Sequence, residues 1–156
     1  MKLSTKTRYG ARILIELALH GRHQAVQVSK IAARQKIPVK YLEQILRELK
    51  QSGLVESIRG PKGGHRLVED PVRISLGKIV RLFEGQTDLV DCISFPENCS
   101  MSEDCLIRNA WNEATTVLYE KLDGISIADL IAGTGGKKAA GSQACPSASD
   151  TLSRKV

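Results

Sequence analysis

Three cysteines that lie close together in the sequence are the residues best suited to chemistry. Cys92, Cys99 and Cys105 are separated by six and five residues, and the polar stretch around them, 88–104, is expected to be an irregular loop. Thiolates bind soft metals and iron–sulfur clusters, and one loop can fold three of them around a single centre. The spacing differs from the C-x2-C pairs of structural zinc sites. The pattern therefore indicates a site for a soft metal or an iron–sulfur cluster.

Two other interpretations of these cysteines remain open. A pair of the thiols could act as a redox switch, or all three could be inert. Their position on a polar loop counts against inert thiols, because unreactive cysteines are usually buried. The fourth cysteine, Cys145, lies near the C-terminus and is expected to be a thiol without function.

The elements that precede the cysteines predict a helix-turn-helix. A first helix is expected over 2–20, a short one over Lys30–Arg34 capped by Ser29, and a longer one with Pro38 in its first turn and Gly53 at its end. The apolar residues of the longer helix, at helical spacing, are Leu42, Ile45, Leu46 and Leu49. A short helix, a tight turn and a longer helix form the DNA-binding arrangement.

The polar face of the longer helix and the segment after it carry the candidate DNA-binding side chains. Two β-like runs, Leu54–Ile58 and His65–Glu69, flank a loop rich in Gly and Pro, which is typical of a wing. Gln can read adenine, Arg and Lys can reach guanine or phosphate, and Arg is favoured in a narrow minor groove. An ordinary polar helix face and a plain Gly-rich turn would explain each feature alone. The candidates are Lys40, Tyr41, Gln44, Arg47, Arg59 and Lys62.

Basic residues are concentrated in the first half of the chain. Residues 1–81 contain 17 Lys or Arg and 6 Asp or Glu, a net charge of +11, and residues 82–156 contain 6 and 11, a net charge of −5. Clustered cations favour a double-stranded DNA partner, although a solvated basic surface would explain the charge equally well. The sequence shows no membrane span and no signal peptide, so we expect a cytoplasmic protein.

The second half predicts helices that follow the DNA-binding part. Ser75 is expected to cap a helix that ends at Gly85, and Ser126 with Asp129 to cap a last helix ending near Ile131. Between them a long helix is expected from 102 or 103 to 123. Its apolar residues form a seam suited to a homodimer, and they are Ile107, Ala110, Trp111, Ala114, Val117, Leu118 and Leu122.

These elements predict a mostly α fold with a small β wing. We expect a winged helix-turn-helix DNA-binding domain over 1–85, a cysteine loop and dimerisation helix over 86–132, and a flexible tail over 133–156.

Four stretches of the sequence also resemble a known family: MKLSTKTRYG at 1–10, YLEQIL at 41–46, GLV at 53–55 and RGPKGG at 59–64. They are similar to the IscR-type iron–sulfur cluster regulators, which are dimeric winged-helix transcription factors of bacteria. The resemblance covers residues 1 to about 131. It implies a repressor or activator whose DNA affinity depends on an iron–sulfur cluster.

The resemblance also implies roles for particular residues. Tyr41 and Gln44 would read bases, and Arg59 would enter the minor groove. The helix over about 103–123 would form the dimer contact. The implied cluster ligands are Cys92, Cys99 and Cys105.

The chain departs from the family pattern where known members place the fourth ligand of the cluster. Well-known members have a His three residues after the third cysteine, where this chain has Arg108, and other members use an acid near position 8, where it has Arg8 and Arg12. An Arg cannot ligate iron. Candidates for the fourth ligand are Asp104, Glu103, Cys145, a group of the partner subunit and an exogenous molecule. Three cysteines and one weak ligand make a labile site suited to sensing, and a four-iron cluster is favoured over a two-iron cluster.

The leading hypothesis is therefore a DNA-binding regulator controlled by an iron–sulfur cluster. The alternative is a thiol-redox-switch or cluster-free repressor of the same fold, and a protein-binding adaptor ranks last because of the basic first half. An enzyme is not expected, because His65 stands alone beside the wing without paired carboxylates, a nucleophile motif or a phosphate loop.

Overall fold

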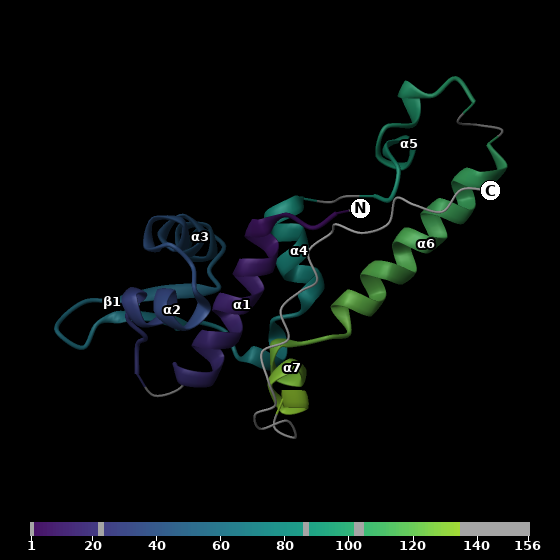
Figure 1. Cartoon of the computed structure of the whole chain (residues 1–156). Helices are drawn as coiled ribbons and strands as arrows, with labels where there is room; N and C mark the ends of the chain where they lie inside the picture. The colour runs from purple at the N-terminus through teal and green to yellow at the C-terminus, as the bar shows by residue number, and fades with distance from the viewer. Residues whose placement is uncertain (1, 22–23, 86–87, 102–104, 135–156) are drawn as a thin grey trace, which may run out of the picture.

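The computed structural model describes residues 2–21, 24–85, 88–101 and 105–134. Its elements in chain order are α1 (Thr5–His20), α2 (Val28–Gln35), α3 (Val39–Gln51), β1 (Val55–Ile58), β2 (Gly64–Leu67), the 3-10 turn η1 (Pro71–Arg73), α4 (Leu76–Glu84), α5 (Asp91–Ser94), the 3-10 turn η2 (Pro96–Asn98), α6 (Leu106–Asp123) and α7 (Ile127–Thr134). Figure 1 shows α1, α2, α3 and the hairpin at one end of the molecule, α4 and α7 in the middle, and α6 as an arm. The expected mostly α fold with a small β wing is confirmed.

The core lies between α1, α3 and the elements that cover them. The four apolar positions expected in the longer helix are all buried: Leu42, Ile45, Leu46 and Leu49. They pack with Ile13 and Leu17 of α1, Ile31 of α2 and Ile79 of α4. Burying each such side chain contributes roughly 1.5–3 kcal/mol, so this cluster holds the recognition-type helix in place.

The start of α2 differs from the expectation. The helix begins at Val28, so Ser29 lies inside it and is not its cap. Val26 exchanges two backbone hydrogen bonds of 2.8 Å with His65 of β2, and this pairing fixes the chain in an extended form until Gln27. Tertiary contact with the hairpin, rather than a capping side chain, therefore sets this boundary.

The turn between α2 and α3 contains no glycine. Lys36 adopts the left-handed conformation with φ 53°, and Ile37 follows it into the core. Pro38 precedes the first residue of α3 with an extended backbone, one position earlier than expected. The helix-turn-helix is otherwise formed as the apolar spacing predicts.

The hairpin forms the wing. β1 and β2 pair antiparallel, with Val55 opposite Leu67 and Ile58 opposite Gly64, close to the two expected runs. Gly64 has φ +155°, and a Cβ on it would lie 2.4 Å from the Val26 carbonyl oxygen. Only glycine lets the wing approach the strand-like segment before α2 this closely.

The helices of the second half follow most of the expected signals. The Ser75 side chain accepts a hydrogen bond from the Lys78 N–H (3.1 Å) and caps α4, with Gly85 after its end. The Ser126 N–H donates to the Asp129 carboxylate (2.9 Å) and the Asp129 N–H donates to the Ser126 hydroxyl (3.1 Å), so the capping box is confirmed. α7 runs to Thr134, three residues past the expected end.

Two expectations near the cysteines need correction. The described part of 88–104 is not wholly irregular, because it contains the short helix α5 and the turn η2. The long helix begins at Leu106 with Cys105 as its N-cap, not at 102 or 103. Residues 102–104, and the tail from 135 onward, lie outside the described residues. None of the helices in the described ranges is long and apolar enough to cross a membrane.

Candidate functional site

The exposed face of α3 carries the polar residues that the sequence singled out. Lys40, Gln44 and Arg47 are exposed, and they come from the face opposite the buried stripe of the same helix. Arg47 also lines a cavity of about 330 Å³ together with Ser57 and His65 of the hairpin. The helix face and the wing therefore form one continuous polar surface.

Tyr41 is the one candidate on α3 that is half-buried. Its ring meets the ring of Tyr9 edge-on, with centroids 5.9 Å apart. The Arg12 guanidinium lies 5.4 Å from the centre of the Tyr9 ring and also donates to the Gln35 side chain (3.0 Å) and backbone carbonyl (2.7 Å). α1 thus positions both the first turn of α3 and the turn before it.

This positioning by α1 was not anticipated from the sequence. A single sequence does not show that Tyr9 on α1 contacts Tyr41 on α3, because this contact depends on the angle at which the two helices cross.

The wing loop presents the two remaining candidates. Arg59 and Lys62 are exposed in the loop between β1 and β2. Below them on the hairpin, Arg66 and Glu56 pair at 2.6 Å across the two strands. Arg66 is therefore committed to the hairpin itself, whereas Arg59 and Lys62 project from its end.

His65 is a strand residue, as expected, and not a lone catalytic base. Burial and the positive charge of Lys50 lower the pKa of His65 below its usual range, against a smaller opposing effect of Glu43. Its Nδ1 lies 3.3 Å from the Ser57 hydroxyl, and its backbone pairs with Val26. The imidazole thus lies within the hairpin, and the His65 backbone joins the wing to the segment before α2.

The three cysteines lie in one segment beside α6. Cys92 belongs to α5, Cys99 follows η2, and Cys105 caps α6. All three are half-buried free thiols. Within the part of the chain that the structure describes, no group of three or more His, Cys, Asp or Glu side chains is close enough to hold a metal ion. The described structure therefore holds the three thiols in one segment without gathering them around a centre.

The possible fourth ligands are only partly placed. Glu103 and Asp104 lie outside the described residues, as does Cys145. Arg8 is exposed near the start of α1, and Arg108 is half-buried in the first turn of α6.

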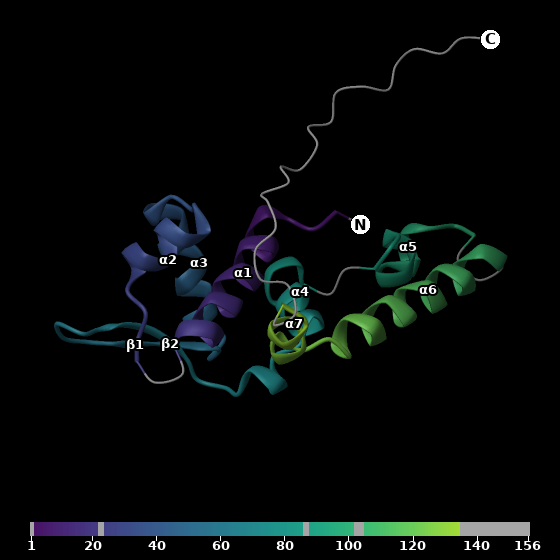
Figure 2. The same ribbon diagram turned by 60° about the horizontal axis from the view of Figure 1, so that its bottom comes forward.

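The cysteine segment lies far from α3 and the wing. Figure 2 shows α5 alongside α6, at the end of the molecule opposite the hairpin. The segment is attached to α6 where the Leu89 N–H donates to the Thr115 hydroxyl (3.3 Å). α6 is joined to α4 by Arg81, which donates two hydrogen bonds to Asp123 (2.7 and 2.6 Å). The cysteine segment is therefore connected to the DNA-binding end through α6 and through α4 and α7, which both pack against α1.

The chain is similar to known transcriptional regulators in sequence and in structure. The chain matches the Rrf2 family model, described as an iron-dependent transcriptional regulator, over residues 3–133. It is 39% identical over 131 residues to the protein rrf2 of Nitratidesulfovibrio vulgaris, covering 84% of this chain and 87% of that protein.

Two solved structures are similar over most of their length. One is the IscR of T. potens, with a TM-score of 0.71 and 31% identity over 90% of this chain and 94% of that one. The other is CymR, described as the global cysteine regulator of B. subtilis, with a TM-score of 0.73 and 34% identity over 86% of this chain and 98% of that one.

Proposed function

The chain belongs to the Rrf2 family of transcriptional regulators, and from this premise we propose that an iron–sulfur cluster held by Cys92, Cys99 and Cys105 controls its binding to an operator. It is a helix-turn-helix transcriptional regulator and not an enzyme. The observation that carries the proposal is the set of three free, half-buried thiols in one segment.

The proposed DNA contacts come from α3 and the wing. Gln44 and Tyr41 would read base edges in the major groove, and Arg59 would enter the minor groove. The remaining exposed cations, Lys40, Arg47 and Lys62, would bind phosphate or guanine. This assignment is supported by the basic charge of this half of the chain and by the exposure of five of the six side chains, Lys40, Gln44, Arg47, Arg59 and Lys62.

The donor chemistry of the cysteine segment fits an iron–sulfur cluster. Thiolates are the usual protein ligands of such clusters, and half-buried free thiols are accessible to assembly. Because the described residues do not already gather three ligands, assembly would have to draw these thiols together. A four-iron cluster with one weakly held position is proposed over a two-iron cluster, since only three cysteines lie in the segment.

A thiol-redox switch is the second candidate function. It is favoured by the same separated free thiols and by the likeness to CymR, a regulator described as governing cysteine. In this case oxidation of two thiols, rather than the cluster, would change operator affinity.

A homodimer formed through α6 completes the proposal. The face of α6 that does not contact the rest of the chain carries large apolar side chains: Leu106 (93% exposed), Ile107 (57%), Trp111 (40%) and Val117 (57%). Thr115 and Tyr119, by contrast, are buried against the same chain. A second copy is the occupant that suits this face, because DNA half-sites are usually read by symmetric dimers.

The test is to purify the protein without oxygen and to determine visible absorption, iron and acid-labile sulfide per subunit. We expect a coloured protein with about four iron atoms per subunit. Cys99→Ala should lose colour, iron and sulfide and remain folded. The matched control, Cys145→Ser, removes the cysteine outside the segment and should keep all three.

Two results would overturn the proposal that the protein binds an iron–sulfur cluster. One is a wild-type protein that stays colourless and iron-free after anaerobic reconstitution, and the other is a Cys99→Ala variant that keeps its chromophore. If the iron-free protein then loses operator affinity on mild oxidation and regains it with a reductant, the thiol switch replaces the cluster as the proposed function.

A further inference from the structure

A basic cavity lies between α2 and the wing, and of the DNA contacts proposed above it includes Lys62. It has a volume of about 310 Å³. The described residues that line it come from the end of α1, the segment before α2, α2 itself and the wing loop, and they are His20, Gln24, Ala25, Val26, Gln27, Lys30, Arg34, Pro61 and Lys62. Lys30 and Lys62 are far apart in the sequence, and the fold brings them to opposite walls of one cavity.

The charge of this cavity is positive. Lys30, Arg34 and Lys62 line it, and no acidic side chain is among the described lining residues. The nearest carboxylate, Glu16, is buried and accepts a hydrogen bond of 2.7 Å from Arg34 Nη1. Its oxygen also lies 3.6 Å from His20 Nε2. Since a guanidinium has five N–H donors, Arg34 is oriented by Glu16 and keeps donors for a ligand.

The two walls of the cavity are held at a fixed separation. The Val26–His65 backbone pair, with two hydrogen bonds of 2.8 Å, ties the entrance of α2 to β2. Gly64 permits this approach, because any Cβ there would meet the Val26 backbone. The backbone elements that carry the cations are therefore held together before any ligand binds.

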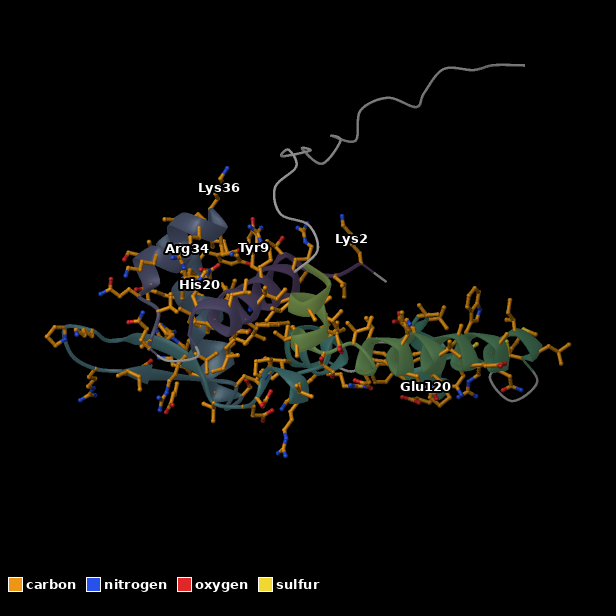
Figure 3. The ribbon with its side chains drawn as sticks, turned by 90° about the horizontal axis from the view of Figure 1, so that it is seen from below. Lys2, Tyr9, His20, Arg34, Lys36 and Glu120 are labelled. Atoms are coloured by element: carbon orange, nitrogen blue, oxygen red, sulfur yellow. The ribbon has the colours of Figure 1, made fainter. Side chains whose placement is uncertain are left out.

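We propose that this cavity is a phosphate-binding site for the DNA backbone. Ammonium and guanidinium groups on two facing walls suit a phosphodiester, and backbone contacts of this kind orient a protein on the duplex. The backbone is preferred over a free phosphate because Lys62 shares the wing loop with Arg59, so the cavity opens beside the groove that the wing would enter. Figure 3 shows Arg34 and His20 at the winged-helix end, away from Glu120 of α6. The inference rests on the proposed DNA contacts.

The test compares Lys30→Ala with Arg73→Ala, which removes an exposed cation from η1, a turn that packs against α7. Affinity is measured at several NaCl concentrations for a duplex selected with the wild-type protein and for a random duplex of equal length. Lys30→Ala should weaken both complexes severalfold and lower the slope of log K against log[NaCl] by about one. Arg73→Ala should change neither quantity.

The failures are distinguishable. A wild-type protein that binds neither duplex would overturn the proposed DNA-binding surface as a whole. A wild-type protein that binds normally, with an unchanged salt slope in Lys30→Ala, would overturn the phosphate site alone. Titration of the DNA-free protein with inorganic phosphate tests whether the cavity binds a free anion instead of the DNA backbone. Saturable binding lost in Lys30→Ala, with DNA affinity unaltered, would assign the cavity to a free anion and overturn the backbone contact.

Discussion

At the scale of single residues, the buried carboxylate of Glu16 shows how the helix-turn-helix is fixed. The side chain is only 5% exposed, yet it accepts hydrogen bonds from Arg34 Nη1 (2.7 Å) and Gln35 Nε2 (2.9 Å). A buried charge is tolerated only when it is paired, and these two partners both come from the end of α2. The contact therefore sets the position of α2 and of the turn that leads into α3.

Replacing Glu16 with Ala should destabilise the protein by about 1–3 kcal/mol, because the paired groups lose a charged acceptor. Urea denaturation measures this change in the free energy of unfolding. The matched control is Glu48→Ala, which removes a carboxylate 2.8 Å from Lys6 in an exposed pair and should cost at most about 1 kcal/mol. Equal effects of the two substitutions would show that Glu16 has no special role.

A second carboxylate, Glu84, should make stability depend on pH. Hydrogen bonds from the Thr7 hydroxyl and from the Ser4 N–H (2.7 Å) lower the pKa of Glu84, against an opposing effect of burial. A lowered folded-state pKa stabilises the protein above the unfolded value of about 4.3, and this contribution is lost as the pH falls through the folded value.

The free energy of unfolding should therefore fall less steeply between about pH 5 and pH 3 in Glu84→Gln than in the wild type. Gln keeps an oxygen that can accept from the Ser4 N–H but does not titrate in this range. Denaturation curves at several pH values give the two slopes. Parallel slopes would mean that Glu84 has the same pKa in the folded and unfolded protein.

At the scale of elements, apolar periodicity and capping residues predicted most of the helices. The boundaries that they did not predict are set by tertiary contacts. The stripe of α3 and the caps Ser75 and Ser126 are local signals, and they were correct. The start of α2 depends on the pairing of Val26 with the wing, which no local pattern shows. The exposed DNA-binding candidates could be named from α3 periodicity, whereas the basic cavity could not, because Lys30 and Lys62 meet only in the fold.

Substitutions at two glycines of the wing test how closely the wing must approach the segment before α2. Gly64→Ala places a Cβ 2.4 Å from the Val26 carbonyl oxygen, so the Val26–His65 pairing has to shift. Gly60 also has a positive φ (+111°), but nothing lies within 4 Å of a Cβ there. We expect Gly64→Ala to lower stability by more than about 2 kcal/mol, and Gly60→Ala by about 1 kcal/mol from backbone strain alone. A Gly60→Ala variant that is the less stable of the two in thermal denaturation would contradict this ranking.

At the scale of the whole molecule, α4 connects the cysteine-bearing end to the DNA-binding end. One end of this helix joins α1, where Glu84 accepts from the Ser4 N–H, and Arg81 joins α6 through Asp123. The Arg81 guanidinium also lies 4.7 Å from the centre of the Tyr119 ring. A change beside α6 can therefore alter the placement of α1, which in turn positions Tyr41 on α3 through Tyr9.

The proposed homodimer through α6 can be tested by placing a charge in its apolar face. Val117→Glu places a charge in the exposed apolar face of α6 and should convert the dimer to a monomer, because burying an unpaired carboxylate at an interface costs several kcal/mol. Since Val117 is 57% exposed in the single chain, the monomer itself should keep its helix content, which circular dichroism measures.

Asn112→Glu introduces the same charge at an exposed position about 140° around α6 from Val117 and should leave the mass unchanged in sedimentation equilibrium. A monomeric Val117→Glu protein should also bind a duplex with two half-sites at least about tenfold more weakly, since it loses the coupled binding of two wings and two α3 helices. A Val117→Glu protein with the wild-type mass would exclude this face of α6 as the dimer contact, and the two half-sites would then have to be read through another surface of the chain.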